Sequence, residues 1–149
     1  MEKGLGYFRE LLGLTEPDFR TYSPLTLAYI GDAVYELVIR TLLVEQGNTQ
    51  VNKLNQRANK LVKASAQSEM IEKLKSHLTE EELGIFRRGR NAKSYTMAKN
   101  ATMSDYRRAT GFEALMGYLY LTEQQERILE LVKLGIQEGE EDGEQIPGK

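Results

Sequence analysis

The stretch Tyr29-Ile30-Gly31-Asp32-Ala33-Val34-Tyr35-Glu36 carries the first sign of both fold and site, because it sets acidic residues inside an apolar run. The run spans residues 25–43 and predicts a buried helix. An ionised carboxylate in such surroundings is costly unless a cation or hydrogen-bond donors compensate it. Gly31 is unfavourable within a helix and predicts the close approach of another backbone. We therefore expect Asp32 to belong to a site.

A second stretch, Gly111-Phe112-Glu113-Ala114-Leu115-Met116-Gly117-Tyr118-Leu119-Tyr120, has the same character. Glu113 alone is consistent with an ordinary core or surface glutamate. Paired with Asp32, it would supply the oxygen ligands that Mg²⁺ prefers, with waters completing an octahedron. Such a metal can activate water and stabilise the departing oxygen in phosphodiester cleavage. The two stretches predict a carboxylate site between packed helices.

The composition indicates one ordinary folded domain. The chain has 149 residues, of which 40% are hydrophobic and 28% charged, as in folded globular proteins. It has no cysteine and a single histidine, His77, which excludes thiolate metal sites and argues against multi-histidine zinc sites and Ser-His-Asp triads. No apolar segment approaches the roughly 20 residues that span a bilayer, and no secretory segment opens the chain. We expect a cytoplasmic protein without membrane contact.

The periodicity of apolar residues predicts an all-α fold. Ser23 precedes Pro24 as a helix N-cap, and Thr79-Glu80-Glu81-Glu82 has the form of a capping box. The expected helices cover residues 5–14, 24–45, 51–65, 65–78, 80–87, 105–121 with Ser104 as cap, and 122–137, with a loop or broken helix over 88–102. We expect one domain over residues 1–137 and a disordered acidic tail over 138–149.

Two of these stretches together resemble a known family. Residues 27–36 are similar to the signature of ribonuclease III, in which a glycine-aspartate core lies on a catalytic helix, and residues 112–121 look like that family's second acidic helix. The resemblance covers roughly residues 23–137. With the basic segment at residues 87–94 and a chain too short for an added double-stranded-RNA-binding domain, it is closest to the Mini-ribonuclease III branch. It implies a single all-α nuclease domain that forms homodimers.

The resemblance assigns Asp32 and Glu113 as catalytic, metal-binding carboxylates and implies Mg²⁺ as cofactor. Two further acidic positions of the family are occupied by Ala28 and Thr110 here, which predicts a sparser metal site; Thr110 would orient a metal-bound water. Glu36 has two interpretations. It either supports catalysis or forms a surface pair with Arg40, four residues on.

A basic segment predicts the surface that binds RNA. Cationic and neutral donors alternate in it, as suits phosphates and ribose hydroxyls, although a solvated charge run is the alternative. The candidate RNA-binding residues are Arg87, Arg88, Arg90, Asn91, Lys93 and Ser94, with Lys60 and Lys63 from a helix face.

The leading hypothesis is a Mg²⁺-dependent endoribonuclease that cleaves double-stranded RNA as a homodimer and leaves 5′-phosphate and 3′-hydroxyl ends. The resemblance implies maturation of the 23S (large-subunit) ribosomal RNA precursor, with a ribosomal protein as a candidate partner that presents it. The alternatives are a non-catalytic double-stranded-RNA-binding module with a partly lost metal site, and a helical protein-interaction domain.

Overall fold

The computed structural model describes residues 4–93 and 102–141, with side chains up to residue 137. Within these ranges every regular element is helical, so the all-α prediction is confirmed. The elements are α1 (Gly4–Leu12), η1 (Phe19–Thr21), α2 (Pro24–Gln46), α3 (Val51–Val62), α4 (Ala64–Leu74), η2 (Lys75–His77), α5 (Glu80–Asn91), α6 (Met103–Leu121) and α7 (Gln125–Glu141).

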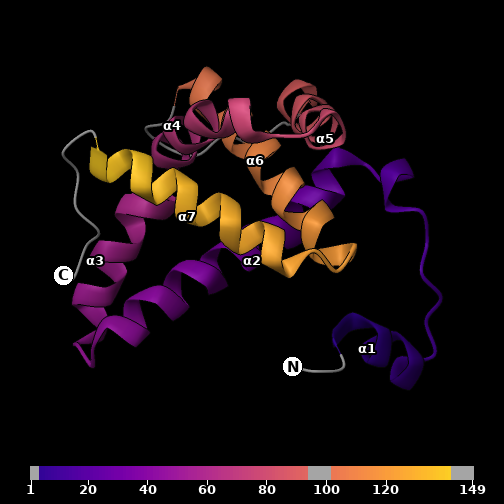
Figure 1. Ribbon diagram of the computed structural model, residues 1–149, viewed down its shortest axis with the longest axis horizontal. Helices are drawn as coiled ribbons and strands as arrows, with labels where there is room; N and C mark the ends of the chain where they lie inside the picture. The colour runs from indigo at the N-terminus through magenta and orange to yellow at the C-terminus, as the bar shows by residue number, and fades with distance from the viewer. Residues whose placement is uncertain (1–3, 94–101, 142–149) are drawn as a thin grey trace.

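Helix α6 lies at the centre of the fold. It packs most extensively against α2 and α5 and also contacts α4, while α7 crosses in front of α2 (Figure 1). Phe112, Leu115 and Leu119 of α6 are fully buried, in one cluster with Tyr35 and Ile39 of α2. Burying each such side chain contributes about 1.5–3 kcal/mol. A central helix surrounded by others explains why α6 shows little one-sided periodicity.

Two predicted helix starts are confirmed. The Ser23 hydroxyl accepts a hydrogen bond from the Leu25 backbone at 3.2 Å, with Pro24 at the first helical position. Thr79 and Glu82 form the predicted capping box, in which each side chain accepts a hydrogen bond from the other's backbone. Local chemistry was sufficient at these ends because the capping groups are close in sequence.

Three predicted boundaries were wrong. The cap of α6 is Thr102 rather than Ser104; its hydroxyl accepts from the Asp105 backbone at 3.0 Å. Helix α5 continues to Asn91 because Gly89 lets it pack against α6: a Cβ on Gly89 would lie 2.8 Å from Gly111 Cα. Helix α7 extends to Glu141, past the start of the predicted tail, and residues 142–149 lie outside the described residues.

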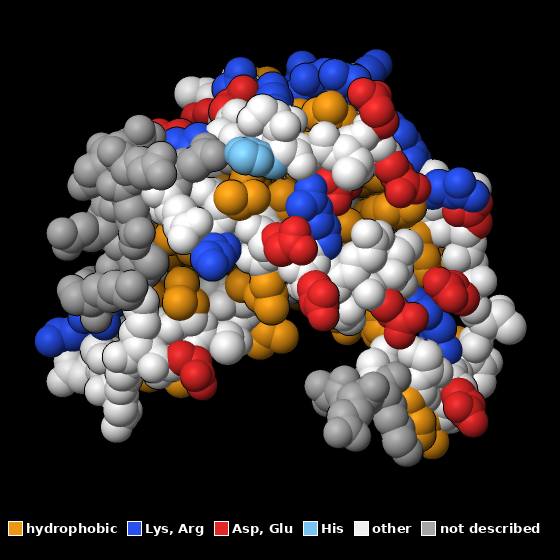
Figure 2. Space-filling model, viewed as in Figure 1, with side chains coloured by type: hydrophobic (Ala, Val, Ile, Leu, Met, Phe, Trp, Pro, Cys, Tyr) orange, Lys and Arg blue, Asp and Glu red, His pale blue; other side chains and the backbone are white. Residues whose placement is uncertain are grey.

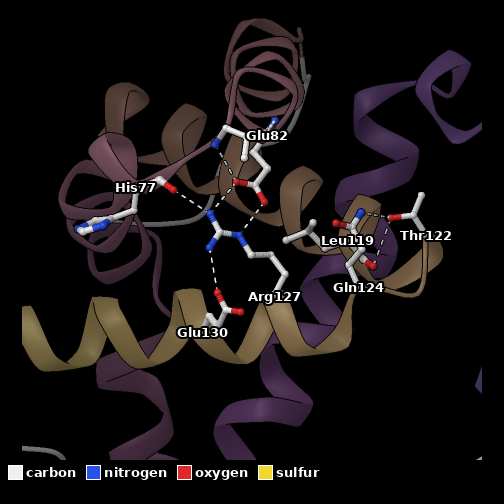
Figure 3. A network of polar contacts seen from close by, with 8 residues as sticks. His77, Glu82, Leu119, Thr122, Gln124, Arg127 and Glu130 are labelled. Atoms are coloured by element: carbon white, nitrogen blue, oxygen red, sulfur yellow. Dashed lines mark hydrogen bonds and ion pairs between the residues drawn. The ribbon is translucent and has the colours of Figure 1, made fainter.

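An ion-pair network ties α7 to α5 (Figure 3). Arg127 donates to both carboxylate oxygens of Glu82, at 2.8 and 2.9 Å, to the His77 carbonyl at 2.7 Å and to Glu130 at 3.1 Å. Burial alone would raise the pKa of Glu82, which is 5% exposed, but bonds from Arg127 and Thr79 bring it below its ordinary value. The capping glutamate thus also locks two helices together.

In the part of the chain that the structure describes, no helix is long and apolar enough to cross a membrane.

Candidate active site

The site is formed where α2 and α6 cross with their backbones in contact. A Cβ built on Gly31 would lie 1.7 Å from the Glu113 carbonyl oxygen, and one on Gly117 would lie 1.9 Å from the Leu27 carbonyl oxygen. No other residue fits at either position without moving a helix. The close backbone approach predicted at Gly31 is confirmed, and the backbone that approaches it is that of Glu113 itself.

This crossing brings the two predicted carboxylates together. Asp32 follows Gly31 on α2, and its carboxyl group lies within hydrogen-bonding reach of the Glu113 carboxyl group. The pKa of Glu113 is raised to about 8, first by burial, then by the charge of Asp32 and a hydrogen bond to it, and less by the charge of Glu36. Two carboxylates in contact resist ionising together unless a cation enters.

The two carboxylates differ in burial, and Asp32 is less buried than its apolar neighbours in sequence predicted. Asp32 is exposed to solvent, whereas Glu113 is half-buried. Asp32 is exposed because Leu27, Gly31 and Tyr35 form the buried face of α2 and Asp32 lies beside that face. Glu113 lies on α6, the central helix, between the buried residues Phe112 and Ala114. Asp32 therefore needs no compensation for burial, and the electrostatic cost falls on Glu113.

The donor set fits a Mg²⁺ ion that keeps most of its waters. Within residues 4–93 and 102–137, no three acidic, histidine or cysteine side chains come together as a metal cluster. Mg²⁺ in enzymes is commonly held by one or two carboxylates, with waters and substrate phosphates completing its octahedron. Asp32 and Glu113 supply that minimum, and their mutual repulsion favours a cation between them.

The two positions that differ from the family pattern are both buried. Ala28 packs with Phe19, Ile85 and other apolar side chains in the smaller of two core clusters. The Thr110 hydroxyl donates to the Tyr106 carbonyl at 3.0 Å within its own helix. That proton is therefore used within α6, and the orienting role of Thr110 stays a prediction.

Glu36 forms the predicted surface pair with Arg40, and its support of catalysis stays a prediction. Its carboxylate lies 3.6 Å from Arg40, whose side chain is exposed, while that of Glu36 is partly exposed. Its charge nevertheless contributes to the raised pKa of Glu113. Glu36 therefore belongs to the electrostatic surroundings of the site.

Gln67 of α4 is a neighbour of Glu113 that was not predicted from the sequence. Its side chain is 2% exposed, and its amide nitrogen donates to the Val62 carbonyl at 2.8 Å and to Glu113 Oε2 at 3.4 Å. This hydrogen bond works against the rise in the pKa of Glu113. The signal was present, because Gln67 shares the apolar helix face of Met70, Ile71 and Leu74.

The basic residues divide into exposed and engaged ones. Arg87 and Lys93 are exposed, as are Lys60 and Lys63 near the end of α3. Figure 2 shows Lys and Arg side chains gathered along the upper edge, over α4 and α5.

Two arginines of α5 take part in packing. Arg88 donates to the Arg20 and Tyr22 carbonyls at 2.9 and 2.8 Å. Arg90 lies over the Phe86 ring and donates to Asn91 at 3.2 Å. Ser94 lies outside the described residues.

Comparison with known proteins agrees with this arrangement. The family profile described as Ribonuclease III domain matches residues 25–124. The chain belongs to the ribonuclease III family. It is 52% identical to Mini-ribonuclease 3 of Clostridium tetani over 123 residues, 82% of each chain. It is 48% identical to Mini-ribonuclease 3 of Thermoanaerobacter sp. over 142 residues, covering 95% of this chain and all of the relative.

The fold has also been seen in a solved structure. The crystal structure of a Fusobacterium nucleatum protein superposes with a TM-score of 0.73 and 34% identity, over 82% of this chain and 98% of that one. The predicted family, fold and endoribonuclease activity are confirmed. Membership of this family favours the enzyme over the non-catalytic RNA-binding module and the protein-interaction domain.

Proposed function

We propose that this endoribonuclease of double-stranded RNA uses Mg²⁺ held by Asp32 and Glu113, acts as a homodimer, and matures the 23S ribosomal RNA precursor in the cytoplasm. The observation that carries the proposal is the contact between the two carboxyl groups at the glycine-mediated crossing of α2 and α6. A metal-dependent phosphodiesterase needs carboxylates that can hold a cation beside a surface that the substrate can reach.

The two carboxylates have different tasks in this mechanism. Exposed Asp32 would be the first carboxylate to hold the cation. Glu113 would carry a proton at neutral pH, because its pKa is raised to about 8, and would release it when a cation binds, because positive charge favours the carboxylate. When bound, Mg²⁺ supplies the positive charge that activates water and stabilises the departing oxygen. Cleavage of the bond to the 3′ oxygen leaves 5′-phosphate and 3′-hydroxyl ends.

The exposed cations support binding of the RNA backbone. Within the described residues, Arg87 and Lys93 make none of the packing contacts that hold Arg88 and Arg90, and Lys60 and Lys63 add positive charge at the end of α3. Double-stranded RNA is recognised mainly through phosphates and 2′-hydroxyls rather than base edges. Such contacts fit a nuclease that recognises the backbone of the RNA duplex rather than its sequence.

An unpaired apolar face supports the homodimer. Tyr29, Leu37 and Val44 of α2 are 83%, 67% and 60% exposed, on the helix that carries Asp32. Exposed apolar side chains gathered on one element mark interaction surfaces. Two-fold pairing through α2 would set one carboxylate pair against each strand of a duplex. The ribosomal RNA precursor as substrate fits the relatives named Mini-ribonuclease 3. A ribosomal protein that presents this substrate is part of the proposal.

The decisive experiment replaces Asp32 by asparagine. Asp32→Asn should reduce Mg²⁺-dependent cleavage of a structured 23S precursor by at least about a hundredfold, since one of two cation ligands is lost. Folding and metal-free RNA binding should persist because Asp32 is exposed. Asp18→Asn, at an exposed aspartate paired with Arg20, is the matched control. Cleavage by purified Asp32→Asn at the wild-type rate would show that the site is elsewhere.

A further inference from the structure

The buried amide of Gln67 lies between the end of α3 and the carboxylate pair. It reaches Glu113 from α4, a third helix that carries neither carboxylate. A hydrogen-bonding side chain at 2% exposure on an otherwise apolar face is unusual, because burial of polar groups costs free energy. Apolar packing therefore does not explain why a glutamine occupies this position.

The Val62 carbonyl fixes which way the Gln67 amide faces. The amide nitrogen donates to this carbonyl at 2.8 Å, so turning the amide over would set two oxygens against each other. In the fixed orientation the same nitrogen points to Glu113 Oε2 at 3.4 Å and can only donate to it. Gln67 can therefore act only as a hydrogen-bond donor to Glu113, which suits an ionised carboxylate.

The amide oxygen of Gln67 indicates that stability alone does not account for this residue. Oε1 is buried and has no hydrogen-bond partner within the described part of the chain. A buried acceptor without a donor destabilises the fold, and methionine would fill a similar volume without that cost. The amide is better explained by what its nitrogen does for Glu113.

We propose that Gln67 is a positioning residue that holds the Glu113 carboxylate in the orientation in which it meets the cation. This inference rests on the proposed Mg²⁺ site at Asp32 and Glu113. Side chains that hydrogen-bond a metal ligand orient it, and their loss typically weakens metal binding about 10–100-fold.

The test compares Gln67→Met with Gln46→Met. Gln46 is the comparison because both atoms of its amide are buried without a partner in the described residues, and it lies at the far end of α2 from Asp32. Mn²⁺ binding, measured by electron paramagnetic resonance without RNA, should be about tenfold weaker in Gln67→Met and unchanged in Gln46→Met. Thermal stability of Gln67→Met should stay near that of the wild type.

Each outcome has a clear meaning. A lower melting temperature with unchanged Mn²⁺ affinity in Gln67→Met would assign the residue a purely structural role and overturn the inference. Absence of Asp32-dependent Mn²⁺ binding in the wild type would overturn the proposed metal site, and the inference with it. The two failures are therefore distinguishable.

The inference can also be tested on the wild-type protein, where the result does not depend on whether a variant folds. The side-chain NH₂ resonances of Gln67 should shift on addition of Mg²⁺, because their acceptor Glu113 becomes a metal ligand, whereas those of Gln46 should not. Saturation of the Asp32-dependent site without any shift at Gln67 would contradict the proposal.

Discussion

Replacing Gly31 by alanine tests whether the helix crossing both supports the fold and sets the site. The added Cβ would lie 1.7 Å from the Glu113 carbonyl oxygen and 2.7 Å from the Gly117 nitrogen. Ordinary contact begins at 3.4 Å, and both obstacles are backbone atoms that no side-chain rotation can move. Helices α2 and α6 must therefore separate, and Asp32 moves away from Glu113.

The magnitude follows from the type of clash. Overpacking of a core costs about 1–3 kcal/mol, and a clash with backbone belongs at the upper end, about 3 kcal/mol. For a chain of this size, that loss lowers the melting temperature by about 6–12 °C. Misplacement of catalytic groups by about 1 Å reduces turnover roughly a hundredfold.

The assay combines unfolding in urea, at one fixed protein concentration, with single-turnover cleavage of duplex RNA well below the melting temperature of the variant. Gly84→Ala on α5 is the control: no atom lies within 4 Å of the added Cβ, so it should gain about 0.5–1 kcal/mol. If Gly31→Ala unfolds and cleaves RNA like the wild type, the close crossing of α2 and α6 is not needed for either stability or activity. Lost stability with an unchanged rate would refute the part of this prediction that concerns the carboxylates.

Three further predictions concern single residues. The folded protein holds the proton of Glu113 more tightly than the unfolded chain does. The free energy of unfolding of the wild type should therefore decrease as the pH rises from 4.5, the ordinary pKa of a glutamate, to about 8. In urea titrations across this pH range, Glu113→Gln should remove the fall; an unchanged slope would contradict the raised pKa. Arg87→Ala should weaken duplex binding and lower its salt slope by about 1, whereas Arg88→Ala should lower the melting temperature; equal effects on both measurements would refute this division. Arg127→Met should cost about 2–3 kcal/mol in chemical unfolding, because Glu82 is left buried without its partner, and a loss below about 0.5 kcal/mol would show that the pair is not stabilising.

Much of the fold was predictable because its signals are local. Helical spacing, the Ser23-Pro24 start and the Thr79 capping box involve residues within one or two turns of each other. The end of α5 was not predictable in this way. It depends on Gly89 packing against Gly111 of α6, a contact between distant parts of the chain that no local periodicity reports.

The candidate site was likewise predictable only in part. The carboxylates Asp32 and Glu113 stood out in sequence because each interrupts an apolar run. Their exposures did not follow from sequence, since exposure depends on which face of α2 or α6 a neighbouring helix covers. Arg88 shows the same limit: its charge predicted RNA contact, yet its guanidinium holds the backbone at Arg20 and Tyr22.

The sequence by itself determined the helical class, the main capping residues, the family resemblance and the two acidic positions, because these depend on residue types at short separations. Only the tertiary structure decided that Gly31 and Gly117 let two backbones touch, and so that Asp32 meets Glu113. It also brought Gln67 to the same carboxylate from a third helix. The physical reason is that burial and electrostatic coupling arise between surfaces, and a surface exists only once the helices have packed.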